Sequence, residues 1–307
     1  MTVHIPILVE PIVTALTEPF LNLSPEAEPH YVVDCTLGGG GHTAAFLKSL
    51  QTHKVLARHR VLALDQDEGA VERAKITFKN ELAQGLLEIA HARFSELPQI
   101  IGERPVLGLM ADLGFSSDQI EDQSRGLSFM KDGPLDMRLD PSRGLSCREY
   151  LKQVAETELT RVLFEYGEER FSRQIARSIV DSRQKGALPE TTSGLVSLVI
   201  RGIPVSARHG RIHAATRTFQ ALRIVVNEEL EELDSLLEHG ILLVKPAGRV
   251  AILSFHSLED RKVKIIFKDK TSQFKQTTKK PIEASDEEQL RNPRSRSAKL
   301  RIAERVL

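Results

Sequence analysis

The chain has 307 residues, of which 41% are hydrophobic, with a formal net charge of zero and a pI near 7.2. This length predicts two domains, or one domain with a large insert. The balanced charge excludes a uniformly basic nucleic-acid binder but leaves a local basic face open.

No apolar run approaches the roughly 18 residues of a membrane span, and the first residues lack the basic start of a secretion signal. Cys35 and Cys147 lie far apart without a partner motif, so we expect neither a disulfide framework nor a zinc site. We therefore predict a cytoplasmic protein without a bound metal or a membrane partner.

After a short helix within residues 5–20, the first part of the chain alternates between strand-like and helix-like patterns. The expected strands are Tyr31–Asp34, Val61–Asp65, Leu87–Ala92 and Val106–Asp112, and the expected helices between them are Thr43–Leu50, Glu68–Phe78 and Glu96–Ile101. This alternation predicts an α/β fold with a parallel, doubly wound sheet. Such sheets bind ligands at the carboxyl ends of their strands.

The alternation stops near Ser116, and the residues up to Arg211 contain helical patterns such as Glu158–Tyr166 and Arg170–Ser182. We interpret this stretch as an inserted helical domain. The predicted boundaries are residues 1–118 and 212–307 for a discontinuous sheet domain, and residues 119–211 for the insert.

After the insert, Phe219–His239 has an apolar stripe that predicts one long helix against the sheet. A strand, Arg249–Ser254, and a helix from Glu259 follow. Lys270–Ser297 is polar and predicts a mobile loop, and Ala298–Val306 alternates like an edge strand.

Four glycines, Gly38–Gly41, separate the first strand from the next helix. Glycine lets the backbone approach a ligand closely, and a helix N-terminus offers free N–H groups. Gly39, Gly41 and Ala44 satisfy a loose dinucleotide-binding pattern, although a glycine cluster can also be a plain turn.

Three of the first four strands end on an acid: Asp34, Asp65 and Asp112. Any one of them could simply cap the next helix. Asp34, directly before the glycines, would repel a pyrophosphate but attract S-adenosylmethionine, which bears an ammonium and a sulfonium. Asp65 could bind the ribose of either cofactor. The residues thus favour a methyl donor over NAD.

Six stretches of the chain match the signatures of one family. They are Asp34–Thr43, Asp112–Gln119, Gly126–Arg138, Tyr166–Arg170, Ala215–Arg223 and Ser254–Arg261. Through them the chain resembles the bacterial 16S ribosomal RNA cytosine-N4 methyltransferase (small-subunit ribosomal RNA methyltransferase H) family, in order from His4 to Arg305. The resemblance implies a Rossmann-like methyltransferase sheet with a helical insert, S-adenosylmethionine as cofactor, and the 16S rRNA of the small ribosomal subunit as partner.

The resemblance also assigns residues to the cofactor. It places Gly40, Gly41 and His42 at the methionine end, Asp65 at the ribose, and Phe94, Asp112 and Gln119 around the adenosyl group. We add Asp34 to these cofactor-binding residues because of its charge. Simpler interpretations exist, since Phe94 could belong to the core and His42 could begin the helix. Ala214 replaces an expected proline, Ala247 replaces a usual glycine, and Lys270–Ser297 is short for the family.

The reaction implied by the resemblance is methylation of the exocyclic N4 of a cytidine. Methylation at C5 would need a cysteine thiolate, and neither cysteine follows a strand where the base should enter. Transfer to N4 needs an oriented amine and a proton acceptor. Asp112, Ser254 and His256 are the candidates, although Ser257–Asp260 also matches a helix-capping box.

Between Arg170 and Arg223 there are many more basic than acidic residues. This pattern is typical of an RNA-binding surface and equally of a solvated helix face. The predicted RNA contacts are Arg138, Arg173, Arg177 and Arg217, with a second basic patch between Arg291 and Arg301.

Other functions remain open at this stage. A methyltransferase acting on DNA or protein is the nearest alternative, and an NAD oxidoreductase is disfavoured by Asp34. A non-catalytic RNA-binding or ribosome-assembly factor with an unused donor pocket is the alternative from another class. The sequence leaves the oligomeric state open.

Overall fold

The computed structural model describes residues 6–24, 26–55, 58–208 and 212–306. The chain divides into two compact units, Met1–Ser116 with Glu231–Leu307, and Ser117–Leu230. We call them the sheet unit and the helical unit. The predicted N-terminal segment begins partly outside the described residues, at Ile5. Among the described residues, no helix has the length and apolar character needed to cross a membrane.

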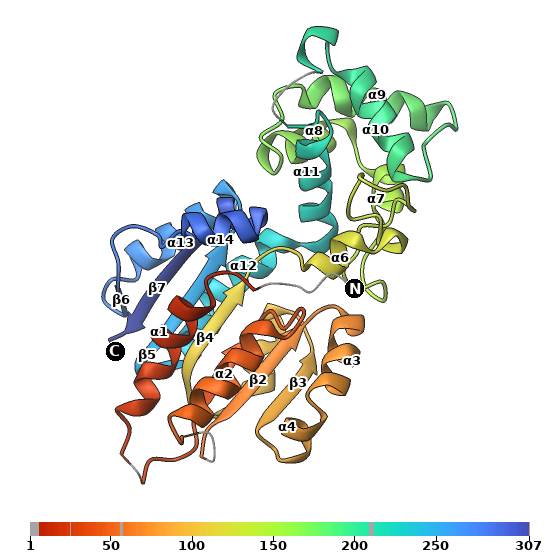
Figure 1. Ribbon diagram of the computed structural model, residues 1–307. Helices are drawn as coiled ribbons and strands as arrows, with labels where there is room; N and C mark the ends of the chain where they lie inside the picture. The colour runs from red at the N-terminus through yellow and green to blue at the C-terminus, as the bar shows by residue number, and fades with distance from the viewer. Residues whose placement is uncertain (1–5, 25, 56–57, 209–211, 307) are drawn as a thin grey trace. The chain divides into compact units, whose positions relative to one another are not determined.

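The sheet unit contains a seven-stranded sheet in the order β3-β2-β1-β4-β5-β7-β6 (Figure 1). Its strands are β1 (Tyr31–Asp34), β2 (Arg60–Asp65), β3 (Leu87–His91), β4 (Val106–Asp112), β5 (Val244–Ser254), β6 (Phe274–Gln276) and β7 (Lys299–Arg305). The first five are parallel in the order β3-β2-β1-β4-β5, and β7 runs antiparallel between β5 and β6. The predicted Rossmann-like sheet is confirmed, and its strand order reverses between β1 and β4, where such folds bind ligands.

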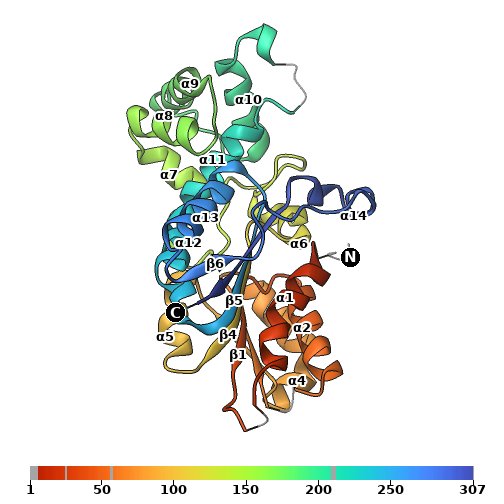
Figure 2. The same ribbon diagram turned by 90° about the vertical axis from the view of Figure 1, so that its left-hand side faces the viewer.

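Helices cover both faces of this sheet (Figure 2). They are α1 (Val9–Leu21), α2 (Gly41–Thr52), α3 (Glu68–Thr77), α4 (Lys79–Ala83), α5 (Leu97–Ile101), α12 (Glu229–Glu238) and α13 (Ser257–Asp269); the sheet unit also contains α14 (Asp286–Arg291), which has no buried residue. Alternate strand residues divide between two cores. Val32 lies in a cluster with residues of α1, α2 and α3, whereas Val33 lies in a cluster with residues of α5, α12 and α13. The near-continuous apolar strands follow from burial on both faces.

The segment Lys270–Ser297, predicted to be a mobile loop, is folded, so that prediction was wrong. It contains β6, α14 and a 3₁₀ helix, Pro293–Ser297. Phe274 is buried beside Phe267, and Ala284 packs into the core, so a few apolar residues suffice to fix the segment. β6 pairs with β7, which is therefore not the edge strand that its alternation suggested.

The helical unit contains helices α6 to α11 and no named strand in its described part. The helices are α6 (Ser117–Glu121), α7 (Cys147–Gln153), α8 (Glu156–Glu165), α9 (Ser172–Gln184), α10 (Thr192–Gly202) and α11 (Thr216–Asn227). α9 packs against both α8 and α10, and α11 packs against α8. A Cβ on Gly167 would lie 2.5 Å from the Arg217 carbonyl, so this glycine permits the close approach of α11.

The predicted single helix Phe219–His239 is two helices, and that prediction was also wrong. Glu228 has a φ of 53°, which ends α11 at Asn227, and α12 begins at the next residue. The buried Asn227 side chain accepts the Leu139 N–H at 2.8 Å and donates to the Met137 carbonyl. The first half of the apolar stripe thus belongs to the helical unit, which continues to Leu230 instead of ending at residue 211 as expected.

Candidate active site

The glycine turn joins β1 to α2 at the carboxyl edge of the sheet. Gly38 and Gly40 have φ values of 48° and 77°, which favour glycine. A Cβ on Gly40 would lie 2.6 Å from Phe78 Cε2, and one on Gly41 would lie 2.7 Å from Pro6 Cγ. The protein's own side chains therefore already require glycine at both positions. Contact of Gly40 and Gly41 with a cofactor stays a prediction.

Asp34 is fully buried at the end of β1. Its carboxylate accepts the Thr43 hydroxyl at 2.7 Å and the Thr36 N–H at 3.1 Å, which ties the glycine turn to the strand and to α2. Burial raises the pKa of this carboxyl, and the nearby His42 opposes the shift. The contact of Asp34 with a cofactor stays a prediction; in this structure its carboxylate is bound within the turn.

Thr36 is a site residue that sequence reasoning did not single out. Its hydroxyl accepts the backbone N–H of Asp112 at 2.7 Å, while its own N–H is bound by Asp34. Thr36 thereby connects the ends of the neighbouring strands β1 and β4. The Asp-x-Thr spacing, in which an Asp accepts the N–H two residues later, is the signal that could have found it.

Asp65 ends β2 and is buried. One carboxylate oxygen accepts the Gly38 N–H at 2.7 Å, and the other accepts the Asp67 N–H at 2.8 Å. Burial raises the pKa of Asp65 to about 6, and the carboxylates of Asp67 and Asp34 add to the effect. Each oxygen retains a further lone pair, so Asp65 can hold the turn and still accept hydroxyl donors.

Asp112, at the end of β4, leaves 16% of its side chain exposed. Burial raises its pKa to about 7; His42 opposes the shift, and the carboxylates of Asp34 and Glu259 add to it. A carboxyl with this pKa changes its charge near neutral pH, as a general base must. The role of Asp112 as a proton acceptor stays a prediction, and its raised pKa is compatible with that role.

His42 is the second residue of α2 and is buried. Its Nε2 lies 3.0 Å from the Ile7 carbonyl oxygen, and its Nδ1 lies 3.8 Å from Asp112 Oδ2. The N-cap of α2 is Gly40, so His42 does not cap the helix. It instead joins the N-terminal segment to the acid at the end of β4.

The two remaining candidates for the adenosyl pocket lie in different units. Phe94 begins a 3₁₀ helix, Phe94–Glu96, directly after β3, and packs partly buried against the core of the sheet unit. Gln119 is a buried residue of α6 in the helical unit. Their contact with a cofactor stays a prediction.

Ser254 and His256 follow the next strand, β5. Ser254 is buried, and its hydroxyl donates to the Lys299 carbonyl of β7 at 3.3 Å. This placement argues against the predicted catalytic role of Ser254, because its hydroxyl is directed into the sheet.

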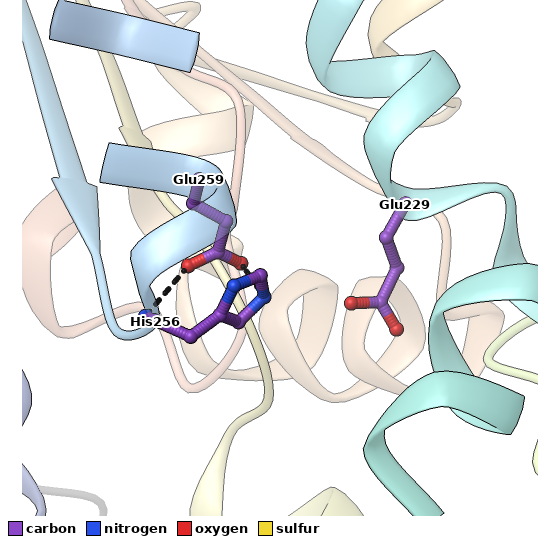
Figure 3. Close-up of side chains that lie close together, drawn as sticks. All are labelled: Glu229, His256 and Glu259. Carbon is purple, nitrogen blue, oxygen red and sulfur yellow. Dashed lines mark hydrogen bonds and ion pairs between the residues drawn. The ribbon is translucent and has the colours of Figure 1, made fainter. Parts of the chain in front are cut away.

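His256 is the N-cap of α13, and its Nε2 lies 3.0 Å from Glu259 Oε1 (Figure 3). The Glu259 carboxylate accepts the N–H groups of Phe255 and His256. The capping box therefore begins at His256, one residue before the predicted one. Of the two candidates beyond β5, His256 is the one whose ring lies beside a carboxylate.

The predicted RNA-contacting arginines fall into two groups. Arg173 and Arg177 on α9 are exposed, and Arg217 on α11 is exposed while donating to the Glu168 carbonyl. Arg138 forms a bidentate pair with Asp136, with both nitrogen–oxygen distances 2.8 Å, and also donates to the Pro141 carbonyl. Because these donors are bound within its own loop, the structure argues against Arg138 as an RNA contact.

The carboxyl edge of the sheet combines a backbone turn with three acids, Asp34, Asp65 and Asp112, whose pKa values are all raised. Such carboxyls gain from a nearby positive charge. A ligand with cationic groups and a ribose fits this set better than one with a pyrophosphate. The site's own residues are therefore compatible with S-adenosylmethionine.

The family model and the sequence relatives agree on one family. A family model described as the MraW methylase family matches residues 1–306. The chain is 42% identical to "Ribosomal RNA small subunit methyltransferase H" of Hydrogenovibrio crunogenus, over 93% of each chain. It is 44% identical to the protein of the same name from Sorangium cellulosum, over 92% of this chain and 87% of that one. Among solved structures, an rRNA methylase from Streptococcus thermophilus is 11% identical with a TM-score of 0.38, covering 96% of this chain and 92% of that one.

Proposed function

Because this chain belongs to the MraW methylase family, we propose that it transfers a methyl group from S-adenosylmethionine to the exocyclic N4 of a cytidine in the 16S rRNA of the small ribosomal subunit. Two relatives that are 42% and 44% identical bear the name of a ribosomal RNA small subunit methyltransferase. The proposal rests chiefly on the match of residues 1–306 to this family, and the structure supports it by placing Asp112 beside His42 of the glycine turn, at the end of β4.

The donor would be held by residues of the sheet unit. Gly40, Gly41 and His42 would lie at its methionine end, with Asp65 at the ribose hydroxyls and Phe94 at the adenine. When bound, S-adenosylmethionine supplies a methyl group on a positively charged sulfur. The buried charge of Asp34 would favour that positive charge.

Asp112 is the group that would receive the proton of the cytidine amine. Its pKa of about 7 leaves a substantial fraction ionised at neutral pH. His42 Nδ1 lies 3.8 Å from Oδ2, so the ring is the nearest basic group to this carboxylate that the structure pairs with it. His256 is the second candidate, and its pairing with Glu259 gives it a fixed position at the adjacent strand end.

The alternative route through C5 of cytosine lacks a suitable nucleophile. Cys35 and Cys147 are both free and buried. Burial raises the pKa of each thiol, so neither forms a thiolate readily. The thiols therefore favour N4, which needs no covalent adduct, over C5.

The helical unit would bind the RNA that flanks the target base. Arg173 and Arg177 lie one turn apart on the same exposed face of α9, which suits contact with successive phosphates. A base must leave its stack before its amine can react, at a cost of a few kcal/mol. Contacts of the helical unit with the flanking strand would offset that cost.

The test is nucleoside mass spectrometry of rRNA from cells with and without the gene, combined with transfer of labelled methyl groups by the purified protein. The proposal requires N4-methylated cytidine to be lost from 16S rRNA without the protein and restored by it. C5-methylcytidine as the product would overturn the assignment of N4. Calorimetry showing no binding of S-adenosylmethionine would favour the ribosome-assembly factor instead, and methylation of DNA or protein alone would replace the substrate.

A further inference from the structure

The peptide bond between Ile7 and Leu8 is hydrogen-bonded on both sides. On one side the Leu8 N–H donates to Glu288 Oε1 at 2.8 Å. On the other side the Ile7 carbonyl oxygen lies 3.0 Å from His42 Nε2. One peptide group thus connects a carboxylate of α14, near the C-terminus of the chain, with a histidine of the glycine turn.

This contact determines which nitrogen of His42 holds a proton. A carbonyl oxygen only accepts hydrogen bonds, so the 3.0 Å contact requires a proton on Nε2. In the neutral ring, Nδ1 is then the unprotonated nitrogen, and it lies 3.8 Å from Asp112 Oδ2. The Ile7 carbonyl therefore favours the tautomer whose unprotonated Nδ1 faces Asp112.

The segment around this peptide is fixed by packing. Ile7 and Leu8 are buried, and the Pro6 ring lies against Gly41 so closely that a Cβ on the glycine would come within 2.7 Å. Leu8 has a φ of 52°, a left-handed conformation that carries an energetic cost for any residue with a Cβ. A cost of this kind persists only where neighbouring contacts impose the conformation, and the bond to Glu288 is one of them.

Glu288 is itself held in place. Its backbone N–H donates to Ser285 Oγ, which caps α14, and its side chain is half-buried. A carboxylate that accepts an N–H polarises the peptide group and makes its carbonyl oxygen a better acceptor. The Glu288 charge should therefore strengthen the hydrogen bond to His42 on the other side of the peptide.

We propose that Glu288 is a positioning residue for the donor site, which holds the Ile7–Leu8 peptide so that His42 keeps its proton on Nε2 and its Nδ1 toward Asp112. This inference rests on the proposed function only for its effect on transfer. The effect on the His42 ring is independent of any ligand. The segment Lys270–Ser297, which contains Glu288, was expected to be a mobile loop, and this role is a different one.

The test compares Glu288→Ala and Glu288→Gln with a matched control, Glu287→Gln. The amide of Glu288→Gln still offers an oxygen to the Leu8 N–H, whereas Glu288→Ala does not. Glu287 is the adjacent residue of α14, is exposed, and pairs with Arg291 on the surface. The control thus removes a charge from the same helix without touching the Ile7–Leu8 peptide.

The first measurement is long-range ¹H–¹⁵N NMR of histidine-labelled protein, which reads the tautomer of the His42 ring without any ligand. The wild type and the control should show a proton on Nε2, and Glu288→Ala should show a mixture of tautomers. The second is calorimetry with S-adenosylmethionine, for which we expect Kd to rise about tenfold in Glu288→Ala, and only slightly in Glu288→Gln. The third is the pH profile of kcat/KM, whose acidic limb should move in Glu288→Ala.

The groups facing His42 and Asp112 in this profile are the carboxyls of Asp34 and Glu259, which all variants retain. The proposal would be overturned if Glu288→Ala lowered only the Tm and left the tautomer, the Kd and the pH profile unchanged. Glu288 would then be a purely structural residue. A changed tautomer in a protein that never methylates RNA would instead support the positioning role and refute the proposed function.

Discussion

Asp34 and Asp65 at the carboxyl edge of the sheet are buried, whereas Arg173 and Arg177 of α9 are exposed. Asp34 and Asp65 accept hydrogen bonds from the backbone and hydroxyls and have raised pKa values. Arg173 and Arg177 project from a helix whose other side is packed. A buried acid of this kind suits one cation of defined shape, while exposed arginines suit a long polyanion with many equivalent phosphates.

The largest effect is expected at the acidic edge, from Asp112→Asn. The amide keeps the shape of the side chain but cannot take up a proton, so kcat for methyl transfer should fall by about 10²–10⁴-fold. RNA retention in a gel-shift assay should remain, since this side chain does not belong to the basic surface.

The matched control for this variant is Asp67→Asn, an acid of the same edge. Asp67 caps α3 by accepting the Gly69 N–H, and asparagine caps helices equally well. We expect Asp67→Asn to retain most of the activity. Retention of more than a tenth of the activity by Asp112→Asn would show that another group accepts the proton.

A smaller effect is expected on the basic face, from the double variant Arg173→Glu with Arg177→Glu. It should raise the KM for RNA by about 10- to 100-fold and reduce the slope of log affinity against log salt, because phosphate contacts are lost. S-adenosylmethionine binding, measured by calorimetry, should stay the same.

Two controls separate charge from position. Arg73→Glu with Lys75→Glu changes the net charge equally on α3 of the sheet unit, where both side chains are exposed, and should leave the KM nearly unchanged. Arg138→Gln breaks the bidentate pair with Asp136 and should lower Tm by a few degrees with little effect on RNA. If all three variants weaken RNA binding alike, α9 has no special part in it.

The smallest effect is expected from pH, on the affinity for S-adenosylmethionine. The pKa values of about 6 for Asp65 and about 7 for Asp112 lie above the roughly 3.9 of an unfolded Asp. The free folded protein then binds more protons than the unfolded chain between about pH 4 and 7, so its free energy of unfolding should fall as pH rises through that interval. A cationic ligand prefers the ionised carboxyls. Its Kd should therefore rise about tenfold when the pH is lowered from 7.5 to 6.

Calorimetry in buffers of different ionisation enthalpy would measure both the Kd and the protons released on binding. In the plot of Kd against pH, Asp112→Asn should remove the change near neutral pH and leave the change that Asp65 causes near pH 6. A Kd that is constant from pH 5.5 to 8 would mean that neither carboxyl is close to the donor's positive charge.

Much of the sheet unit was predictable because short stretches of the sequence determine its strands. The apolar runs that became β1 to β4 end within a residue of the expected positions, since strands buried on both faces consist almost wholly of apolar residues. The glycines and the acids that follow the strands also lie where a parallel sheet puts them. Strand order, by contrast, depends on pairings between distant residues, and no local pattern specifies them.

The errors arose where a distant partner decides the structure. No glycine or proline marks the end of α11, because Glu228 takes its left-handed conformation while the Asn227 side chain binds the loop at Met137 and Leu139. The polar segment Lys270–Ser297 folds because a few apolar residues, including Phe274, reach the core. The loop bound by Asn227 lies 88 residues away along the chain.

The site shows the same limit at the level of single residues. The position of Asp34 at the end of a strand predicted that it belongs to the site. Its complete burial and its hydrogen bonds with Thr36 and Thr43 could not be predicted. The contact of His42 with Ile7 depends on a segment 35 residues away. Composition likewise does not distinguish the exposed Arg173 from Arg138, which is bound within its own loop.

The sheet unit is assembled from two stretches of chain with the whole helical unit between them. During synthesis β4 emerges well before β5, its parallel neighbour, so one edge of β4 stays open while the helical unit is made. At about 5–20 residues per second, that interval is on the order of ten seconds. The helical unit can fold in this time, but the sheet cannot close until β5 and β7 have left the ribosome. Glu288 lies in α14, between those two strands in the sequence, so the donor site is finished only when the last part of the chain is made.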